Sequence, residues 1–382
     1  DYNCEVPELL APLAHSDFFD FGKEEFDVNA TYIVGRTTVA EHNKKIRSFI
    51  DQGVKFVFSN PAEGSTTMSG QFVHLNILDL VLDRKMSVIS GGEIAEDVDY
   101  YNHDNFAVKL SNFDENIQAM SSVSAIHNKK DKPYTFLFLN GRMRTHRKWM
   151  LARLRQLNLL QDSLYTNLHE RAAPRGGMQV YEADTNLMDE IEPIVLLPKQ
   201  YEVDRYAQRI ARPSIDRNIK SHLFKVGGHA EWGEAYIKPE PYIDTYFSLV
   251  SETIFQESPM FRTEKIWKPI IIGHPFVAMG SQYFYKHLHN LGFQTFSSLI
   301  DESWDSIEDG ETRAEGIAQT ILSMCKSDLN TFQQQAKNIC LHNQQRFLEY
   351  SQQLKDEFPN NFKKWIESIW IVKDESISKL KF

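Results

Sequence analysis

Two clusters of basic residues in the second half of the chain have residue types that could bind an anion. The first cluster, residues 140–148, begins directly after an apolar run and contains Arg142, Arg144, Arg147 and Lys148. A helix N-terminus already carries partial positive charge from its free N–H groups, so added cations are unfavourable there unless an anion is bound. We therefore expect a phosphate-like ligand at this cluster. The alternative is a solvated basic turn, or one that neighbouring acids neutralise.

The second cluster, residues 261–268, has the pattern of a capped helix start with a cation on each side. Thr263 is a suitable N-cap because its hydroxyl can accept a hydrogen bond from a free helix N–H. Glu264 follows where the helix dipole favours an acid, and Arg262 and Lys265 flank this position. The cluster predicts a second anion contact, with an ordinary capped helix and a solvated lysine as the alternative.

Alternating apolar segments predict the elements that position both clusters. Runs of strand length alternate with segments of helical spacing, which is typical of a parallel sheet with helices on both faces. Ligands of such sheets bind beyond the carboxyl ends of the strands, where both clusters lie. The predicted strands are residues 31–34, 54–58, 86–90, 134–139, 194–197, 246–250 and 276–279. The predicted helices include residues 73–82, a helix from the first cluster to about Leu160, and residues 332–354 and 362–370, separated by Pro359.

The length of 382 residues favours two domains, and the polar, proline-ended segment 128–133 is the predicted linker. We expect an α/β protein with a Rossmann-like domain over residues 1–130 and a second over residues 134–354. A C-terminal helix and tail, residues 355–382, would pack back on the first domain. Two such domains would face each other across a cleft.

Composition disfavours several classes of protein. The net charge of −10 and the isoelectric point of about 5.7 argue against a general nucleic-acid coat, which needs a broad basic face. The sequence contains no run of 18 apolar residues, so we expect no membrane span. The first residues lack the basic and apolar regions of a signal peptide. The chain has only three cysteines, which suits a reducing compartment. We therefore expect a cytoplasmic protein.

The second cluster and its surroundings resemble the signature of the alpha-1,3-fucosyltransferases, glycosyltransferase family 10. Thr263-Glu264-Lys265 precedes an apolar helix and then Pro275-Phe276-Val277-Ala278-Met279-Gly280, as in that signature. Upstream, Tyr246-Phe247-Ser248-Leu249-Val250-Ser251-Glu252-Thr253 is similar to the family's strand, with Ser-Glu-Thr in place of its Glu-Asn-Ser turn. Farther along, Leu291-Gly292-Phe293-Gln294-Thr295-Phe296, followed by Asp301-Glu302, resembles uncharacterised phage and bacterial relatives.

The resemblance covers roughly residues 242–305 and implies a GT-B fold, an inverting mechanism and a GDP-sugar donor in the C-terminal domain, without a metal or other cofactor. Glu264 would bind the ribose hydroxyls and Lys265 the diphosphate. Arg142 or Arg144 of the first cluster would pair with the phosphates. His274 is expected to be a structural histidine, with a contact to the nucleotide base as the alternative, because it lies beside the expected donor site. The other expected donor-binding residues are Arg147, Ser251, Arg262 and Thr263. The acceptor would be a glycan or another hydroxyl compound, and for a phage protein the location would be the host cytoplasm.

A base is needed to take the proton of the acceptor hydroxyl, and a carboxylate after an N-terminal strand suits this role. Glu63 and Glu93 are the two candidates, with Glu63 slightly preferred. Asp97-Val98-Asp99 has the spacing of the metal-binding pair of GT-A enzymes and keeps a metal-dependent alternative open. A hard divalent cation would need more oxygen ligands than these two.

The altered turn at residues 251–253 leaves a non-catalytic function open, namely a binding or virion-associated protein with a degenerate glycosyltransferase fold. A further version of the enzyme would glycosylate modified DNA bases, so that nucleic acid would be the acceptor. The negative net charge counts against this version.

Overall fold

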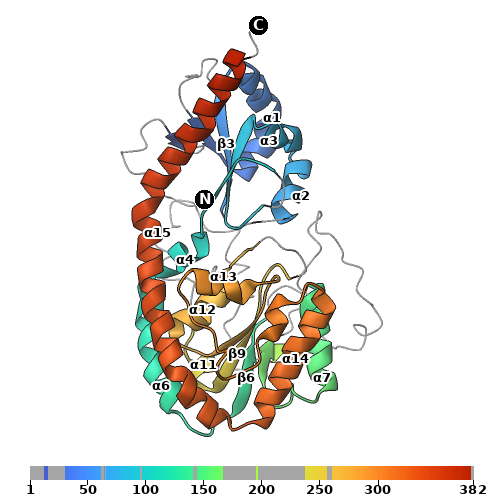
Figure 1. Ribbon diagram of the computed structural model, residues 1–382, viewed down its shortest axis with the longest axis vertical. Coiled ribbons are helices and arrows are strands. Elements are labelled where there is room, and N and C mark those ends of the chain that lie inside the picture. Colours follow the sequence, from blue (N-terminus) through green and yellow to red (C-terminus); the bar gives the residue numbers. More distant parts are fainter. Residues whose placement is uncertain are drawn as a thin grey trace, which may run out of the picture. The chain divides into compact units, whose positions relative to one another are not determined.

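The computed structural model describes residues 13–15, 31–61, 64, 66–94, 97–140, 144–166, 195–196, 237–255 and 260–379. These residues form two compact units, each with its own sheet (Figure 1). The first unit comprises the described residues up to Asn105, Met260 and Phe261, and those from Ser351 onward. The second unit comprises the remainder, from Phe106 to Tyr350. The expected linker, residues 128–133, lies inside the second unit, because the chain divides after Asn105 instead.

The sheet of the first unit is parallel throughout, with strand order β1-β2-β3-β4-β5. Its strands are β1 (Leu13–His15), β2 (Thr31–Val34), β3 (Lys55–Asn60), β4 (Met86–Ser90) and β5 (Tyr100–Asn102). All five residues of β4 are buried, including Ser87 and Ser90, as expected for an interior strand of a parallel sheet covered on both faces. The three predicted strands of this region are confirmed, and β1 and β5 are additions of three residues each.

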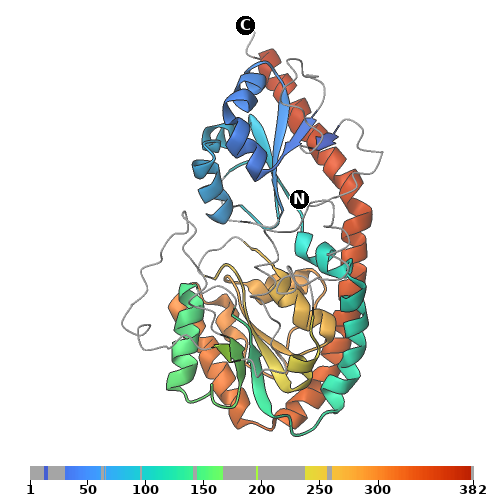
Figure 2. The ribbon, with the colours of Figure 1, turned by 180° about the vertical axis from the view of Figure 1, so that it is seen from behind.

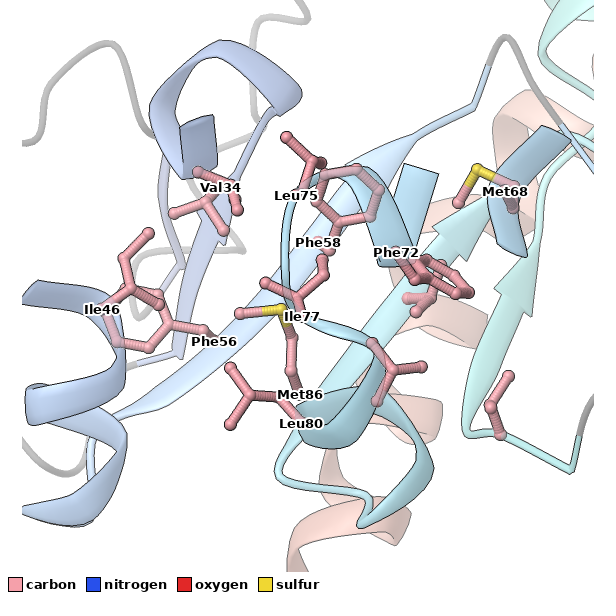
Figure 3. Close-up of a cluster of buried hydrophobic side chains, with 14 of the residues drawn as sticks. Val34, Ile46, Phe56, Phe58, Met68, Phe72, Leu75, Ile77, Leu80 and Met86 are labelled. Carbon is pink, nitrogen blue, oxygen red and sulfur yellow. The ribbon is translucent and has the colours of Figure 1, made fainter. Parts of the chain in front are cut away.

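Helices supply one apolar layer against this sheet. They are α1 (Arg36–Asp51), α2 (Thr66–His74) and α3 (Leu78–Leu82). Figure 3 shows Phe56 and Phe58 of β3 within the resulting core, together with Ile46 of α1 and Phe72 of α2. The single helix predicted over residues 73–82 is wrong, because the chain turns at Asn76, whose φ of 54° is left-handed.

A second apolar cluster of the first unit involves the end of the chain. Phe362 and Ile366 of α15 (Leu329–Lys379) pack with Val57 of β3 and Ile89 of β4. The break predicted at Pro359 is wrong, since α15 continues through this position. Proline removes one helix hydrogen bond, but the apolar residues that follow it are fixed by this packing against the sheet.

The sheet of the second unit has strand order β10-β9-β6-β7-β8 and is parallel except where β8 pairs antiparallel with β7. Its strands are β6 (Tyr134–Phe138), β7 (Leu164–Thr166), β8 (Val195–Leu196), β9 (Thr245–Ser251) and β10 (Phe276–Met279). The α/β prediction is therefore confirmed, with one antiparallel edge. All seven residues of β9 are buried, so this strand lies in the centre of the unit's core.

The helices of the second unit position both basic clusters. They are α4 (Asn105–Ser111), α5 (Asp114–Ala119), α6 (Val123–Asn128), α7 (Thr145–Gln156), α11 (Glu240–Ile243), α12 (Glu264–Ile272), α13 (Phe284–Asn290), α14 (Gly310–Lys326) and the first part of α15. Helices α7 and α14 lie side by side, and α6 lies along α15 (Figure 2). Helix α7 ends at Gln156, before the predicted Leu160, because Asn158 adopts a left-handed φ of 57°. None of the described helices combines the length and the hydropathy that a membrane crossing requires.

The segment expected to be a linker is tied into this unit by its lysines. Lys129 forms an ion pair with Asp244, and the buried Lys132 donates from Nζ to the Thr245 carbonyl at 2.7 Å. Burial lowers the pKa of Lys132 to about 7. A solvated linker does not bury a lysine in this way, which explains why polar composition misplaced the boundary.

Candidate functional site

Helix α12 begins at the carboxyl end of the second unit's sheet with the cap that the sequence predicts. Thr263, at the N-cap, accepts a hydrogen bond from the backbone N–H of Lys265 at 3.4 Å. The helix ends at Gly273, whose φ of 73° is left-handed. Pro269 lies inside the helix without ending it, and Ile266, Ile270 and their neighbours are buried. The start of α12 is therefore fixed by packing behind it.

The ammonium of Lys265 is held above this helix start by three oxygen atoms. Its Nζ lies 2.7 Å from a carboxylate oxygen of Glu264, 3.1 Å from the Thr263 hydroxyl and 3.3 Å from the Thr253 hydroxyl. Its side chain keeps 23% of its surface exposed. A cation with a fixed position and an open side can meet an anion that arrives from solvent.

Glu264 is buried beside this lysine. Burial raises the pKa of its carboxyl group, but the charges of Lys265 and Lys268 and the hydrogen bond from Lys265 outweigh that effect, so the pKa is lowered overall. Glu264 is thus an ionised acceptor. An ionised carboxylate at this place can accept hydrogen bonds from ligand hydroxyl groups.

A second buried carboxylate lies directly behind the helix start. Glu252 follows β9, has no exposed surface, and accepts hydrogen bonds from the Thr263 backbone N–H (3.1 Å), the Thr263 hydroxyl (2.5 Å) and the Thr253 N–H (3.2 Å). Burial raises its pKa, while Lys265 and the Thr263 hydroxyl oppose this rise. The sequence marks the turn at residues 251–253 but gives Glu252 no role. The signal that could have found this role is an acid placed directly after a mostly apolar strand.

The first basic cluster is arranged differently, because its central residues point into the protein. Arg147 is 2% exposed and donates to the carbonyls of Ser251 (3.0 Å) and Glu252 (3.1 Å) and to the Ser251 hydroxyl (3.3 Å). His146 lies 3.0 Å from the Glu252 carbonyl through Nε2, and its ring stacks on Phe255. Burial, followed by the charge of Arg147, lowers the pKa of His146 to about 3. Both side chains therefore bind the chain after β9.

A buried arginine that sequence reasoning missed completes this arrangement. Arg313 of α14 is 1% exposed and donates to the carbonyls of Phe255, Ile307 and Glu308. Its guanidinium carbon lies 4.5 Å from the centroid of the Phe255 ring. The signal that could have found it is an arginine on the apolar stripe of α14, beside Ala314 and Ile317. The segment from Ser251 to Phe255 is thus fixed from both α7 and α14.

The structure brings together most of the predicted donor-binding residues of the second unit. Ser251 and Thr263 are buried and act as hydrogen-bond partners of Arg147 and Glu252, respectively. Arg144 occupies the N-cap position of α7, and Arg262 directly precedes Thr263; both are partly exposed. Arg142 lies outside the described residues.

His274 is not at this site. It is 1% exposed, and its ring nitrogens contact the Thr245 carbonyl (2.9 Å) and the Ser248 hydroxyl (2.8 Å). Thr245 begins β9, whereas the site follows the end of that strand, and α12 itself spans about 14 Å at 1.5 Å per residue. Burial lowers the pKa of His274 well below its usual value. His274 is a core histidine, and the alternative contact with a nucleotide base is not supported.

Of the two predicted catalytic bases, the structure describes only Glu93. Glu63 lies outside the described residues. Glu93, in the first unit, accepts a hydrogen bond from the Met260 N–H at 2.9 Å, and its own N–H donates to the Met260 carbonyl at 2.9 Å. A side chain on Gly92 would meet that carbonyl and the Phe261 ring, each at 2.8 Å, so glycine is required where residues 260–261 pass. Glu93 therefore anchors this segment.

The aspartate pair of the metal-dependent alternative is engaged by an arginine. Arg84 lies 2.9 Å from Asp97 and 3.7 Å from Asp99. Within the residues described by the structure, no group of three or more His, Cys, Asp or Glu side chains is placed to hold a metal ion. The spacing of the two aspartates is thus accounted for by a surface ion pair.

Searches against protein-family models, curated proteins and solved structures found no match to this chain. Its function must therefore be inferred from the second unit: one partly exposed ammonium, one ionised carboxylate and a capped helix start at the carboxyl end of a mostly parallel sheet. Together these groups can bind a ligand that carries both an anion and hydroxyl groups.

Proposed function

We propose that the chain is a glycosyltransferase that transfers a fucose-like sugar from a nucleotide-sugar to a hydroxyl acceptor, with inversion and without a metal. The observation that carries the proposal is the position of Lys265. Its ammonium is partly exposed, held by Glu264, Thr263 and Thr253, and placed where ligands of parallel sheets bind. In the proposal the two α/β units form a GT-B arrangement, and the second unit binds the donor.

The chemistry of sugar transfer matches this set of groups. Negative charge develops on the departing diphosphate, and a fixed cation at a helix N-terminus stabilises that charge without reorganising. In the proposal Lys265 supplies this cation, and Arg144 at the start of α7 and Arg262 before α12 add positive charge to the donor site. Glu264 accepts hydrogen bonds from the ribose hydroxyls, and the resemblance favours a GDP-sugar. Glu63 or Glu93 of the first unit would take the proton of the acceptor hydroxyl.

The test is a thermal-shift screen of the whole chain with GDP-, UDP-, CMP- and ADP-sugars, compared with the variant Lys265→Ala. A ligand that binds only the folded protein raises the melting temperature by mass action. One class of nucleotide-sugar should stabilise the wild type and not the variant. With an acceptor identified, Lys265→Ala should lower kcat by on the order of a hundredfold to a thousandfold. Equal shifts in both proteins, or no shift with any donor, would overturn the proposal.

A second candidate function is a binding protein that keeps the donor site and lacks turnover. The inward orientation of Arg147 favours it, because this arginine donates to main-chain carbonyls and leaves fewer cations for a departing diphosphate. Release of nucleoside diphosphate during long incubation with the bound donor distinguishes the two functions. An enzyme hydrolyses its donor slowly, and the release is lost in Lys265→Ala. A binding protein returns the donor intact.

A further inference from the structure

The carboxylate of Glu252 and the hydroxyl of Thr263 form a chain of hydrogen bonds that ends at Lys265. The Thr263 hydroxyl lies 2.5 Å from Glu252, 3.1 Å from the Lys265 ammonium and 3.4 Å from the Lys265 backbone N–H. A hydroxyl group has one proton to donate and two lone pairs to accept with. Both contacts from Lys265 are donors, so the hydroxyl proton must point to Glu252.

We infer that Glu252 is a positioning residue, which fixes the direction of the Thr263 hydroxyl and thereby holds the Lys265 ammonium at the ligand side of α12. Its relevance to sugar transfer rests on the function proposed above. Glu252 has no exposed surface and therefore acts through its neighbours, not by touching a ligand.

The hydrogen bonds around Glu252 require a group that only accepts. One carboxylate oxygen receives the Thr263 N–H, and the other receives the Thr263 hydroxyl and the Thr253 N–H. A glutamine of the same shape has one oxygen and one NH₂ group. It would oppose the Thr263 N–H in one orientation and donate to the Thr263 hydroxyl in the other. Either orientation disturbs the hydrogen bonds from Glu252 through Thr263 to Lys265, although the side chain keeps its size and shape.

The same carboxylate also fixes where the neighbouring residues lie. Thr253 and Thr263 come from opposite ends of the segment between β9 and α12, and both bind the carboxylate of Glu252 and the Nζ of Lys265. Arg147 and His146 hold the Glu252 carbonyl from behind. The position of Lys265 therefore depends on a series of contacts that begins at the buried Arg147, passes through Glu252, and reaches the lysine through Thr253 and Thr263.

The experiment measures the acylation rate of each lysine in the whole chain with a small N-hydroxysuccinimide ester, using peptide mass spectrometry. Glu252→Gln should free the Lys265 ammonium and accelerate its acylation between about twofold and tenfold, the range that loss of one hydrogen bond gives. The buried Lys268 reports general loosening, and the exposed Lys286 reports reagent activity; both rates should stay unchanged.

Further variants of Thr263 and Glu252 complete the test. Thr263→Val removes the hydroxyl and should accelerate Lys265 as Glu252→Gln does, whereas Thr263→Ser keeps the hydroxyl and should match the wild type. In the Thr263→Val background, Glu252→Gln should add nothing, because both changes break one chain of bonds. If Glu252→Gln does not fold, Glu252→Asp withdraws the carboxylate by one methylene group and should give the same acceleration.

An unchanged Lys265 rate in the folded Glu252 variant would overturn the inference, and so would effects that simply multiply in the double variant. Binding of GDP by each variant is measured separately by calorimetry. If the Lys265 rate responds as expected while neither the wild type nor any variant binds a nucleotide, the proposed function fails and the positioning role of Glu252 stands.

Discussion

The two basic clusters of the second unit have similar compositions, but the cations at their centres make different kinds of contact. At the start of α7, Arg147 and His146 turn inward and bind main-chain oxygens of Ser251 and Glu252. At the start of α12, Lys265 stays partly exposed and is held by side-chain oxygens. Arg147 donates to backbone carbonyls and so fixes a loop. Lys265 lies among hydroxyl and carboxylate groups and keeps an exposed side, so it can contact a ligand.

This difference follows from the strand between the clusters. The segment after β9 leaves the sheet, and its buried carbonyl groups need hydrogen-bond donors. Arg147 and Arg313 provide those donors from the two adjacent helices. Arg147 of the first cluster therefore fixes the segment after β9, and Glu252 of that segment in turn contacts Thr263 at the start of α12.

The largest expected effect is on stability, from Arg147→Met. Methionine fills similar space and leaves the Ser251 and Glu252 carbonyls without their charged donor, which should lower the free energy of unfolding by about 3 kcal/mol. Urea denaturation measures this change. Arg153→Met on the same helix is the matched control, because its ion pair with Glu315 is partly exposed and is worth less than about 1 kcal/mol. Similar losses in both variants would remove the distinction between inward and outward cations.

The next effect is a pH dependence that comes from His146. Its folded pKa of about 3 lies below the unfolded value, so the unfolded state binds the proton first as the pH falls. The stability contribution is complete above the unfolded pKa near 6.5 and decreases as the pH falls toward the folded pKa. Between pH 7 and pH 5, the wild type should lose about 2 kcal/mol more than His146→Phe.

Chemical denaturation at several pH values measures this difference. The two proteins should show parallel stability between pH 7 and pH 8, where His146 is neutral in both folded and unfolded chains. A wild type and variant with the same slope between pH 7 and pH 5 would contradict the neutral state of the half-buried His146.

The smallest stability effect is expected from Lys265→Ala. The lysine side chain is partly exposed, and Lys268 also lies near the buried Glu264 carboxylate, so loss of Lys265 should lower the free energy of unfolding by only about 1 kcal/mol. The same variant should abolish stabilisation by the nucleotide-sugar. A large loss of stability would show that Lys265, like Arg147, has a structural role. The proposed difference between a structural first cluster and a ligand-binding second cluster would then be wrong.

Much of the fold was predictable because the central strands are buried on both faces. β4, β9 and β10 are short, mostly apolar segments whose length and order indicate an α/β sheet. The short strands β1, β5 and β7 have three residues each, too few for a period to be visible. The helical break at Asn76 and the continuity at Pro359 depend on local backbone geometry and on tertiary packing, which outweigh sequence propensity.

The candidate site was predictable only where local rules determine it. The N-cap at Thr263 and the acid at Glu264 follow from helix chemistry, and the structure has both as expected. The inward turn of Arg147 and the roles of Glu252 and Arg313 depend on contacts across 11 to 105 residues of sequence. The structural interpretation of His274 is confirmed, because this buried residue follows the C-terminal end of α12, whereas the candidate site lies at the start of that helix.

The packing of Phe362 and Ile366 on Val57 and Ile89 has a consequence for synthesis on the ribosome. Strands β3 and β4 need residues made about 300 positions later, which corresponds to roughly 15 to 60 s of translation. Until then, an apolar face of the nascent sheet lacks these partners and is available to chaperones or to other chains. A chain that stops at Tyr350 would never acquire them, so loss of a short C-terminal piece should damage the N-terminal half of the protein first.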